Sequence, residues 1–204
     1  MNAAAIVECL LDAPSAAGLT GKQLMESPQY FPGSMAYQKD SKFRPIGAGN
    51  FGTFTVIEQD SEFVYAINPQ LNTGFVFTAT DVANPPKIGM TPVLYVQLRK
   101  TGIKGYLQAH HLRIRHAYAQ QGVATRWYMA YVHRYGGIVS DFEHLEGGKR
   151  LWRMFVNTAT ARGFKISLVD TVTGTWTPLG VETPDSTVWS LDASKRELVL
   201  VLEQ

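Results

Sequence analysis

The stretch that decides the fold runs from residue 106 to residue 135 and reads YLQAHHLRIRHAYAQQGVATRWYMAYVHRY. Its first half follows a two-residue period, which predicts a strand over Tyr106–Arg115 with alternate side chains on one face. After Gln121 the apolar spacing becomes helical and predicts a helix over Val123–Tyr135, which Gly136-Gly137 ends. A short turn therefore joins a strand to a helix in the middle of the chain.

Strand-like and helical segments continue on both sides of this stretch. Runs rich in β-branched and aromatic residues predict further strands at Thr53–Glu58, Glu62–Asn68, Gly74–Val82, Pro92–Lys100, Ile138–Ser140, Phe164–Val169 and Glu197–Glu203. Capping signals and helical spacing predict helices at Ala3–Leu11, Thr20–Glu26 and Gly147–Ala161. This order predicts an α/β (α+β) fold with a mixed, mostly antiparallel sheet flanked by helices. It also predicts a helical extension over residues 1–30 and a single domain over residues 31–204.

The composition excludes several classes of protein. Of the 204 residues, 45% are hydrophobic and 18% are charged, which excludes an intrinsically disordered chain. The single cysteine, Cys9, excludes an internal disulfide framework and cysteine-based zinc sites. No apolar run approaches the ~20 residues that cross a bilayer, and the first residues do not resemble a signal peptide. We therefore expect a cytoplasmic protein that does not bind membranes.

Positive charge is concentrated in the second half of the chain. Eight Lys and Arg residues but only three carboxylates lie between His110 and Gly163, so this segment carries a net charge of +5. A local positive field favours a phosphorylated ligand or nucleic acid, and a solvated basic surface explains the same pattern equally well. All five histidines lie here too, but none forms a helically spaced pair with a carboxylate, so we expect no metal site.

The turn over residues 115–125 has the chemistry of an anion site. Gly122 leaves room for a ligand to approach the main chain, and Ala124 is the next smallest residue. Consecutive amides at such a turn point outward, and the N-terminus of the following helix adds partial positive charge. Arg115 and Arg126 would add side-chain contacts to phosphate. The turn therefore predicts a site for a pyrophosphate group.

A second glycine-rich segment, Gly47–Gly52, has the spacing G-x-G-x-x-G and precedes a predicted strand, as in protein kinases. Other kinase residues are missing, because Asn68 stands where the phosphate-pairing lysine belongs and His133-Arg134-Tyr135 lacks the catalytic aspartate. We therefore interpret this segment as a flexible turn. The aromatic residues of the predicted helix over Val123–Tyr135 are interpreted as core packing rather than as a surface on which nucleic-acid bases stack.

Around this turn, over about Tyr106–Asp170, the sequence resembles the GNAT superfamily of acyl-CoA-dependent N-acyltransferases. The family's pyrophosphate loop reads Gln/Arg-x-x-Gly-x-Gly/Ala; Gly122 and Ala124 match its small positions, and Ala119 stands at its first position. The segment that follows is similar to that of phage- and plasmid-encoded members of the family. If the gene belongs to a phage, the expected location is the cytoplasm of the host cell. The resemblance implies a GNAT-like sheet and binding of acetyl-CoA or another acyl-CoA. The implied binding residues are Leu112, Ile114, Gln120, Gln121, Gly122, Val123, Ala124 and Thr125.

The resemblance also implies direct attack of an acceptor amine on the thioester. His110 lies where many members place the base, and a histidine that is hydrogen-bonded within the sheet explains it equally well. Asp141, after the next strand, is a base, a substrate anchor or the cap of the next helix. The family's acid position falls on Trp152, whose indole cannot protonate a thiolate, and its pantetheine-binding Asn falls near Leu145. Two alternatives to an amine acyltransferase stay open. One is a degenerate domain that binds a protein, a host factor if the gene is viral, and the other is an enzyme that acylates a nucleobase.

Overall fold

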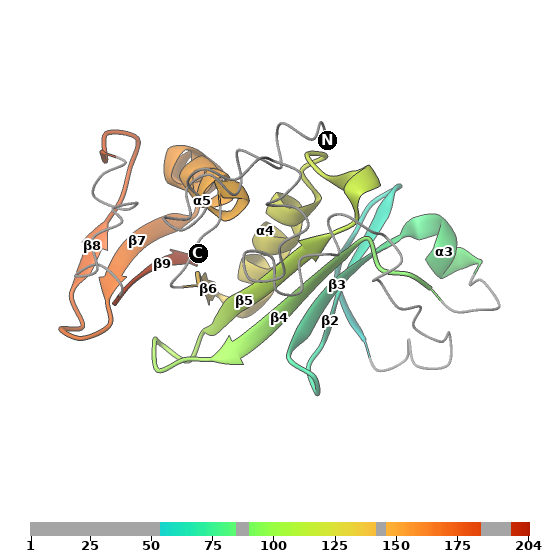
Figure 1. Cartoon of the computed structure of the whole chain (residues 1–204), viewed down its shortest axis with the longest axis horizontal. Coiled ribbons are helices and arrows are strands. Elements are labelled where there is room, and N and C mark those ends of the chain that lie inside the picture. Colours follow the sequence, from blue (N-terminus) through green and yellow to red (C-terminus); the bar gives the residue numbers. More distant parts are fainter. Residues whose placement is uncertain (1–53, 85–89, 142–145, 185–196) are drawn as a thin grey trace, which may run out of the picture. The chain divides into compact units, whose positions relative to one another are not determined.

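The computed structural model describes residues 54–84, 90–141, 146–184 and 197–204 (Figure 1). These residues form nine strands, which are β1 (Thr55–Gln59), β2 (Phe63–Asn68), β3 (Thr73–Thr78), β4 (Leu94–Lys100), β5 (Leu107–Ile114), β6 (Gly137–Val139), β7 (Lys165–Asp170), β8 (Trp176–Pro178) and β9 (Leu198–Glu203). The α-helices are α3 (Ala79–Ala83), α4 (Val123–Tyr135) and α5 (Glu146–Thr158), and the 3-10 helices are η5 (His116–Tyr118) and η6 (Thr160–Arg162). The fold is therefore mixed α+β, as the sequence predicts.

The described residues divide into two compact units. The first unit contains residues 54–99 and 110–130, and the second contains residues 100–109 and 131–204. The division crosses β4, β5 and α4, so each of these elements begins in one unit and continues in the other. Each unit has its own buried core.

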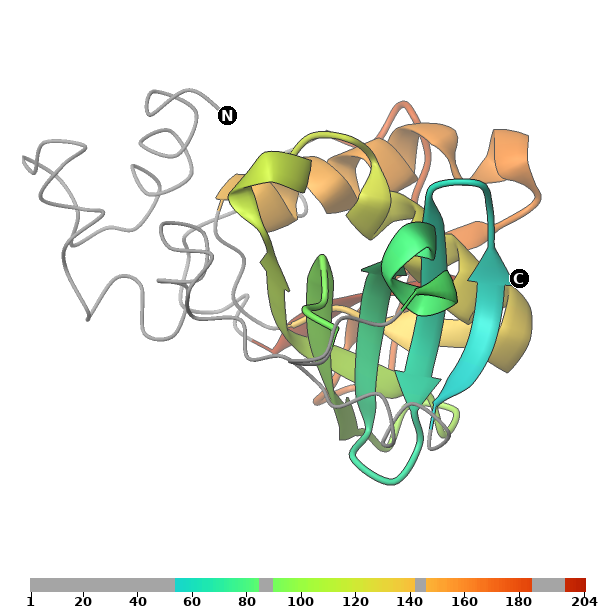
Figure 2. The ribbon, with the colours of Figure 1, turned by 90° about the vertical axis from the view of Figure 1, so that its right-hand side faces the viewer.

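The first unit is built on the strand order β1-β2-β3-β4-β5. Neighbouring strands from β1 to β4 are antiparallel, and Figure 2 shows β1, β2 and β3 side by side. The side chains of β2 are all buried, so this strand is covered on both faces. On one side of β3, Phe75 and Phe77 pack with Met90 and the partly buried Phe54, and this aromatic cluster forms one half of the core.

Helix α4 is fixed to the other side of β3 by its largest side chain. Trp127 is fully buried and its indole nitrogen donates to the Ala66 carbonyl at 3.4 Å. The ring lies directly against Gly74, where a Cβ atom would overlap it. The apolar stripe predicted for this helix is confirmed, because Val123, Trp127 and Ala130 are all buried. Close packing of one aromatic ring on one glycine therefore sets where α4 begins relative to β2 and β3.

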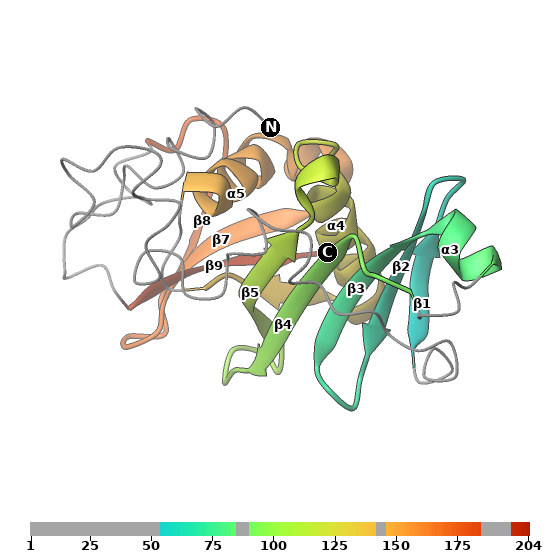
Figure 3. The same ribbon diagram turned by 45° about the vertical axis from the view of Figure 1, so that its right-hand side comes forward.

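The second unit is built on the strand order β5-β6-β9-β7-β8. The β5 and β6 strands pair in parallel through Leu107–Ile138 and Gln108–Val139, whereas β6–β9, β9–β7 and β7–β8 are antiparallel. Helix α5 lies along one face of these strands, as Figure 3 shows. Four valines of β6, β7 and β9 form a second cluster with Tyr106 and Trp176 packed against it.

The structure corrects the predicted elements at two places. The strand predicted over Gly74–Val82 ends at Thr78, because the Thr78 hydroxyl accepts the Asp81 amide at 3.1 Å and caps the short helix α3. Strand β8 lies in a segment rich in turn residues that predicted no strand. The prediction of a helix over Val123–Tyr135 is confirmed residue for residue.

Other predictions fall on residues that the structure does not describe. These are the helices over 3–11 and 20–26, the boundary at residue 30, and the Gly47–Gly52 turn. Among the described residues, no helix combines the length and apolar character needed to span a bilayer.

Candidate anion site at the turn between β5 and α4

The turn between β5 and α4 is shaped by two residues in the left-handed region. Gln120 has φ of +65° and Gly122 has φ of +74°. The preceding η5 is closed by hydrogen bonds from the Tyr118 amide to the Arg115 carbonyl at 2.9 Å and from the Ala119 amide to the His116 carbonyl at 3.2 Å. Glycine suits its position because it adopts positive φ without steric cost.

The amides after this bend have no internal acceptors. In the part of the chain that the structure describes, no hydrogen bond is donated by the main-chain amides of Gln120, Gly122, Val123, Ala124 and Thr125. The amide of Gln121 donates only a long bond, 3.4 Å, to the Tyr118 carbonyl. The 13-residue helix α4 adds the partial positive charge of its N-terminus. A run of unused amides at a helix N-terminus suits an oxyanion ligand.

The turn is also open to solvent. Gln120, Gln121 and Gly122 are exposed, and a Cβ atom at Gly122 would meet no atom within 4 Å. The residues that follow are anchored, because the Val123 side chain is buried. The buried Val123 side chain therefore anchors the exposed bend to the core of the first unit.

Contacts upstream of the turn hold it to the first unit. The Arg115 amide donates to the Val93 carbonyl at 2.9 Å, which ties the end of β5 to the residue before β4. The Tyr118 ring meets the Phe63 ring edge-to-face at 5.9 Å between centroids, and the Arg115 guanidinium lies 5.4 Å from the Tyr118 ring centre. These contacts fix η5 against β2.

The prediction that Arg126 contacts phosphate is not supported. Its Nε lies 2.7 Å from Glu58 Oε1 and one terminal nitrogen lies 2.8 Å from Asp60 Oδ2, so two carboxylates already occupy the guanidinium. Its charge is therefore neutralised, and the three side chains together carry −1. The contacts predicted for an anion at this turn are therefore reduced to the main chain and Arg115, whose guanidinium lies near the Tyr118 ring.

The same ion pairs affect Asp60. Burial tends to raise the pKa of Asp60, but the amides of Phe63 and Glu62 and the Arg126 charge outweigh it and hold the pKa below its ordinary value. The two amides donate to Asp60 Oδ1 at 2.7 and 2.6 Å. The sequence gives no signal for this cluster, because Arg126 and Glu58 are 68 residues apart.

His110 lies on β5 in the first unit and is half-buried. Its ring lies against that of His111, with 4.0 Å between the ring centroids. Burial first, and then the charges of His110, Arg113 and Arg99, lower the pKa of His111 below its ordinary value. Of the two predicted catalytic residues, His110 is the one in the same unit as the turn.

Asp141 belongs to the second unit and follows β6. Its carbonyl accepts the hydroxyl of the fully buried Ser140 at 2.9 Å. The Ser140 carbonyl accepts the Gln108 amide nitrogen at 2.8 Å, and the Leu200 amide donates to the Ser140 hydroxyl at 2.9 Å. This network fixes the main chain at Asp141.

Three positions depart from the family motif, and the first of them, Ala119, lies in the turn, where its amide donates to the His116 carbonyl. Trp152 is buried in the second unit and meets Phe155 edge-to-face at 5.7 Å, so it is a core residue. Leu145 lies outside the described residues. Within the described ranges, no three His, Cys, Asp or Glu side chains gather as a metal ion would need.

A scan against protein-family models and a search of curated protein sequences found no match to this chain. The interpretation of the turn therefore stands on its own geometry and on the sequence motif.

Proposed function

We propose that this chain is an acyl-CoA-dependent N-acyltransferase of the GNAT type, which transfers an acetyl group from acetyl-CoA to an amine. The observation that carries the proposal is that the main-chain amides of Gln120 and of Gly122 to Thr125 donate no hydrogen bond within the described residues, beside a bend that is exposed at Gln120–Gly122. A diphosphate presents several oxygens to accept such donors, and the open space beside Gly122 admits its close approach.

The order of elements also supports the proposal. A strand, β5, leads through this turn into α4, and α4 leads to β6, which pairs in parallel with β5. Parallel neighbours need a crossover connection of this kind, and the family motif lies at the start of such a crossover.

In the proposed reaction the diphosphate of the donor binds the amides of Gly122, Val123 and Ala124, and the main chain at Leu112 and Ile114 holds the pantetheine arm. The acceptor nitrogen forms a bond to the thioester carbonyl carbon, and the carbon–sulfur bond breaks. One proton of the acceptor ammonium passes to the His110 imidazole, which lies in the same unit as the turn, a second leaves the attacking nitrogen to solvent water, and the thiolate takes a proton from water.

The buried position of Trp152 favours a second candidate function, a domain of the same fold that binds a protein without catalysis. A core tryptophan supplies no acid at the position where the family places one. Release of free thiol from acetyl-CoA in the presence of amines distinguishes the enzyme from this binding domain.

Calorimetric titration of the full chain with acetyl-CoA tests the proposed site. We expect Gly122→Asp to weaken binding by at least about tenfold, because it sets a carboxylate beside the amides that hold the diphosphate. Aspartate tolerates the left-handed region better than most residues, which limits the backbone strain.

Gly174→Asp is the matched control, because Gly174 has φ of +72° and equally open surroundings in the second unit. The Gly174→Asp variant should bind acetyl-CoA with the same affinity as the unmodified chain. The proposal fails if acetyl-CoA does not bind, or if both variants bind it equally well.

A further inference from the structure

A cavity of about 510 Å³ lies in the second unit, distinct from the turn that carries the proposed function. Its apolar lining includes Phe164, Trp176 and Leu179, and its charged lining consists of Lys104, Lys165 and Glu203. A volume of this size is within the range of small-molecule sites, in which apolar walls combine with a few charged groups.

The strand register explains why these residues meet. Lys165 of β7 lies opposite Glu203 of β9, and Val169 lies opposite both Val199 of β9 and Trp176 of β8. Since Lys165 and Val169 are four residues apart on one strand, their side chains share a face. The face therefore has a charged end at Lys165 and an aromatic end at Trp176.

The hairpin between β4 and β5 brings a second lysine to this face. Lys104 and Gly105 have φ of +47° and +75°, and the Tyr106 amide donates to the Ile103 carbonyl at 2.8 Å, as in a type I′ turn. The Lys104 ammonium lies 2.8 Å from Glu203 Oε2 and 4.2 Å from the centre of the Trp176 ring. A lysine in the left-handed region is uncommon, and the side chain of this one contacts two residues of the cavity wall.

One carboxylate oxygen of Glu203 is engaged by two residues of this hairpin. Its Oε2 atom accepts the Lys104 ammonium and also the Tyr106 hydroxyl, at 3.2 Å. The Tyr106 ring rests on Gly137, where a Cβ atom would come within 2.5 Å of it. Tyr106 and Lys104 therefore hold the only carboxylate among the described residues that line the cavity.

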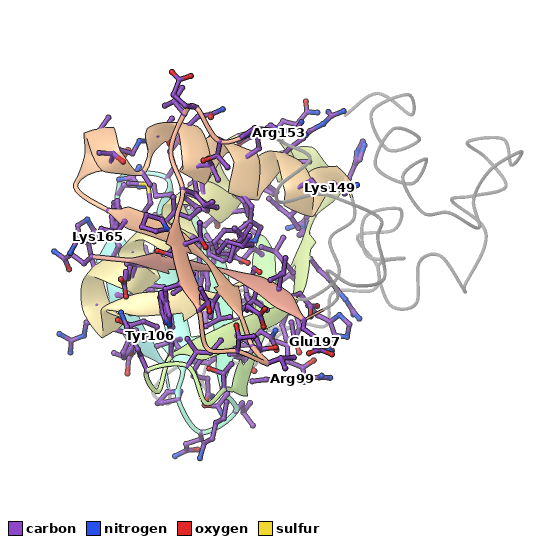
Figure 4. All side chains as sticks on the ribbon, turned by 90° about the vertical axis from the view of Figure 1, so that its left-hand side faces the viewer. Arg99, Tyr106, Lys149, Arg153, Lys165 and Glu197 are labelled. Atoms are coloured by element: carbon purple, nitrogen blue, oxygen red, sulfur yellow. The ribbon has the colours of Figure 1, made fainter. Side chains whose placement is uncertain are left out.

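Among the described residues, no carboxylate lies within ion-pair distance of the Lys165 ammonium. Its side chain is exposed and extends outward from the sheet in Figure 4. Within the described ranges it forms no ion pair, although it lies opposite Glu203 in the register. The two lysines and one glutamate give the described lining a net charge of +1, beside an aromatic wall.

We propose that this cavity binds a small organic anion with a flat apolar body, of the aryl carboxylate class. The ring of the ligand lies against the half-buried Trp176, beside Lys104, and its carboxylate pairs with Lys165. A cationic ligand is disfavoured by the two lysines, and a neutral ligand leaves Lys165 without a counter-charge.

The test uses indole-3-acetate as the probe, with indole-3-acetamide as its neutral counterpart and tryptamine as its cationic one. Amide chemical shifts of the full chain, followed by NMR during titration, give the site and the dissociation constant. We expect indole-3-acetate to shift the amides of β7 and β8 and to bind at least about threefold more tightly than indole-3-acetamide. Tryptamine should bind more weakly than both.

Lys165→Gln should weaken indole-3-acetate binding by about three- to fivefold and leave indole-3-acetamide unchanged. Arg134→Gln is the matched control, since Arg134 is also an exposed cation of the second unit and does not line the cavity. A second variant, Trp176→Leu, should weaken both probes.

The proposal is overturned if indole-3-acetate shifts no amide of β7 or β8 at ~10 mM, a concentration well above millimolar dissociation constants. It is also overturned if Lys165→Gln has no effect, or if the neutral and cationic probes bind as tightly. None of these three results bears on the proposed acetyl-CoA site, whose residues lie in the first unit.

Discussion

Two turns of this molecule share the same uncommon backbone conformation, but they differ in whether their main-chain amides donate hydrogen bonds within the protein. The hairpin at Lys104 and Gly105 and the bend at Gln120 and Gly122 each place one glycine and one other residue at positive φ. In the hairpin, the amides of Ile103 and Tyr106 are both used, by the Thr101 hydroxyl and the Ile103 carbonyl. In the bend, a series of amides faces solvent. Left-handed backbone therefore does not by itself decide whether the amides of a turn are used within the protein.

Both turns rest on an aromatic ring that packs on a glycine. Trp127 lies on Gly74 below the bend, and Tyr106 lies on Gly137 beside the hairpin. The difference is in burial, because Trp127 is fully buried and Tyr106 is only partly buried. We therefore expect the base of the bend to be the more rigid of the two.

The largest effect is expected from Gly74→Ala. The added methyl group overlaps the Trp127 ring, which has no space to move, so the free energy of unfolding should fall by about 3 kcal/mol. Gly137→Ala should cost less, about 1–2 kcal/mol, because the Tyr106 ring can shift toward solvent.

Urea denaturation at neutral pH measures both variants. The control is Gly180→Ala, since a Cβ atom there meets nothing within 4 Å and the expected change is within ~0.5 kcal/mol. Equal losses for Gly74→Ala and Gly137→Ala would contradict the difference in rigidity.

A smaller effect is expected from Asp60→Asn, and it should depend on pH. Because the pKa of Asp60 is lowered in the folded state, its carboxylate stabilises the fold above the unfolded value of about 3.8, and this stabilisation is lost as pH falls through the folded pKa. The variant should lose about 1 kcal/mol at pH 7 relative to the unmodified chain, and the difference should vanish near pH 2.

The comparison for this prediction is Asp170→Asn. Asp170 accepts the amides of Val172 and Thr173 in the same manner as Asp60 accepts its own two amides, but no arginine pairs with it among the described residues. Unfolding curves at several pH values should therefore show a smaller pH-dependent difference for Asp170→Asn. An equal difference would mean that Arg126 contributes nothing to the Asp60 site.

The smallest effect is expected from Lys104→Asn. Asparagine relieves the strain of positive φ, while the exposed ion pair with Glu203 is lost, and the two changes offset each other. Thermal unfolding should show a change of less than ~0.5 kcal/mol. A large loss would show that the ion pair, rather than the hydrogen bonds of the turn, holds the hairpin.

Local patterns predicted much of the fold. The helix over Val123–Tyr135 follows from apolar spacing and a terminal glycine, and the burial of Leu94, Val96 and Leu98 follows from alternation along β4. Strand β8 could not be predicted in this way, because its three residues are held in a strand only by pairing with β7. The end of β3 depended on a single capping hydroxyl at Thr78, within a run that otherwise favours a strand.

By itself, the sequence determined that a glycine turn joins β5 to α4, because this depends on neighbouring residues, and the anion site at that turn stays a prediction. Only the tertiary structure decided which side chains take part. It paired Arg126 with Glu58 and Asp60, buried Trp152 in the core, and placed Lys165 at a cavity where, among the described residues, it forms no ion pair. Contacts between residues far apart in the chain arise only when strands and helices pack, and no local pattern encodes them.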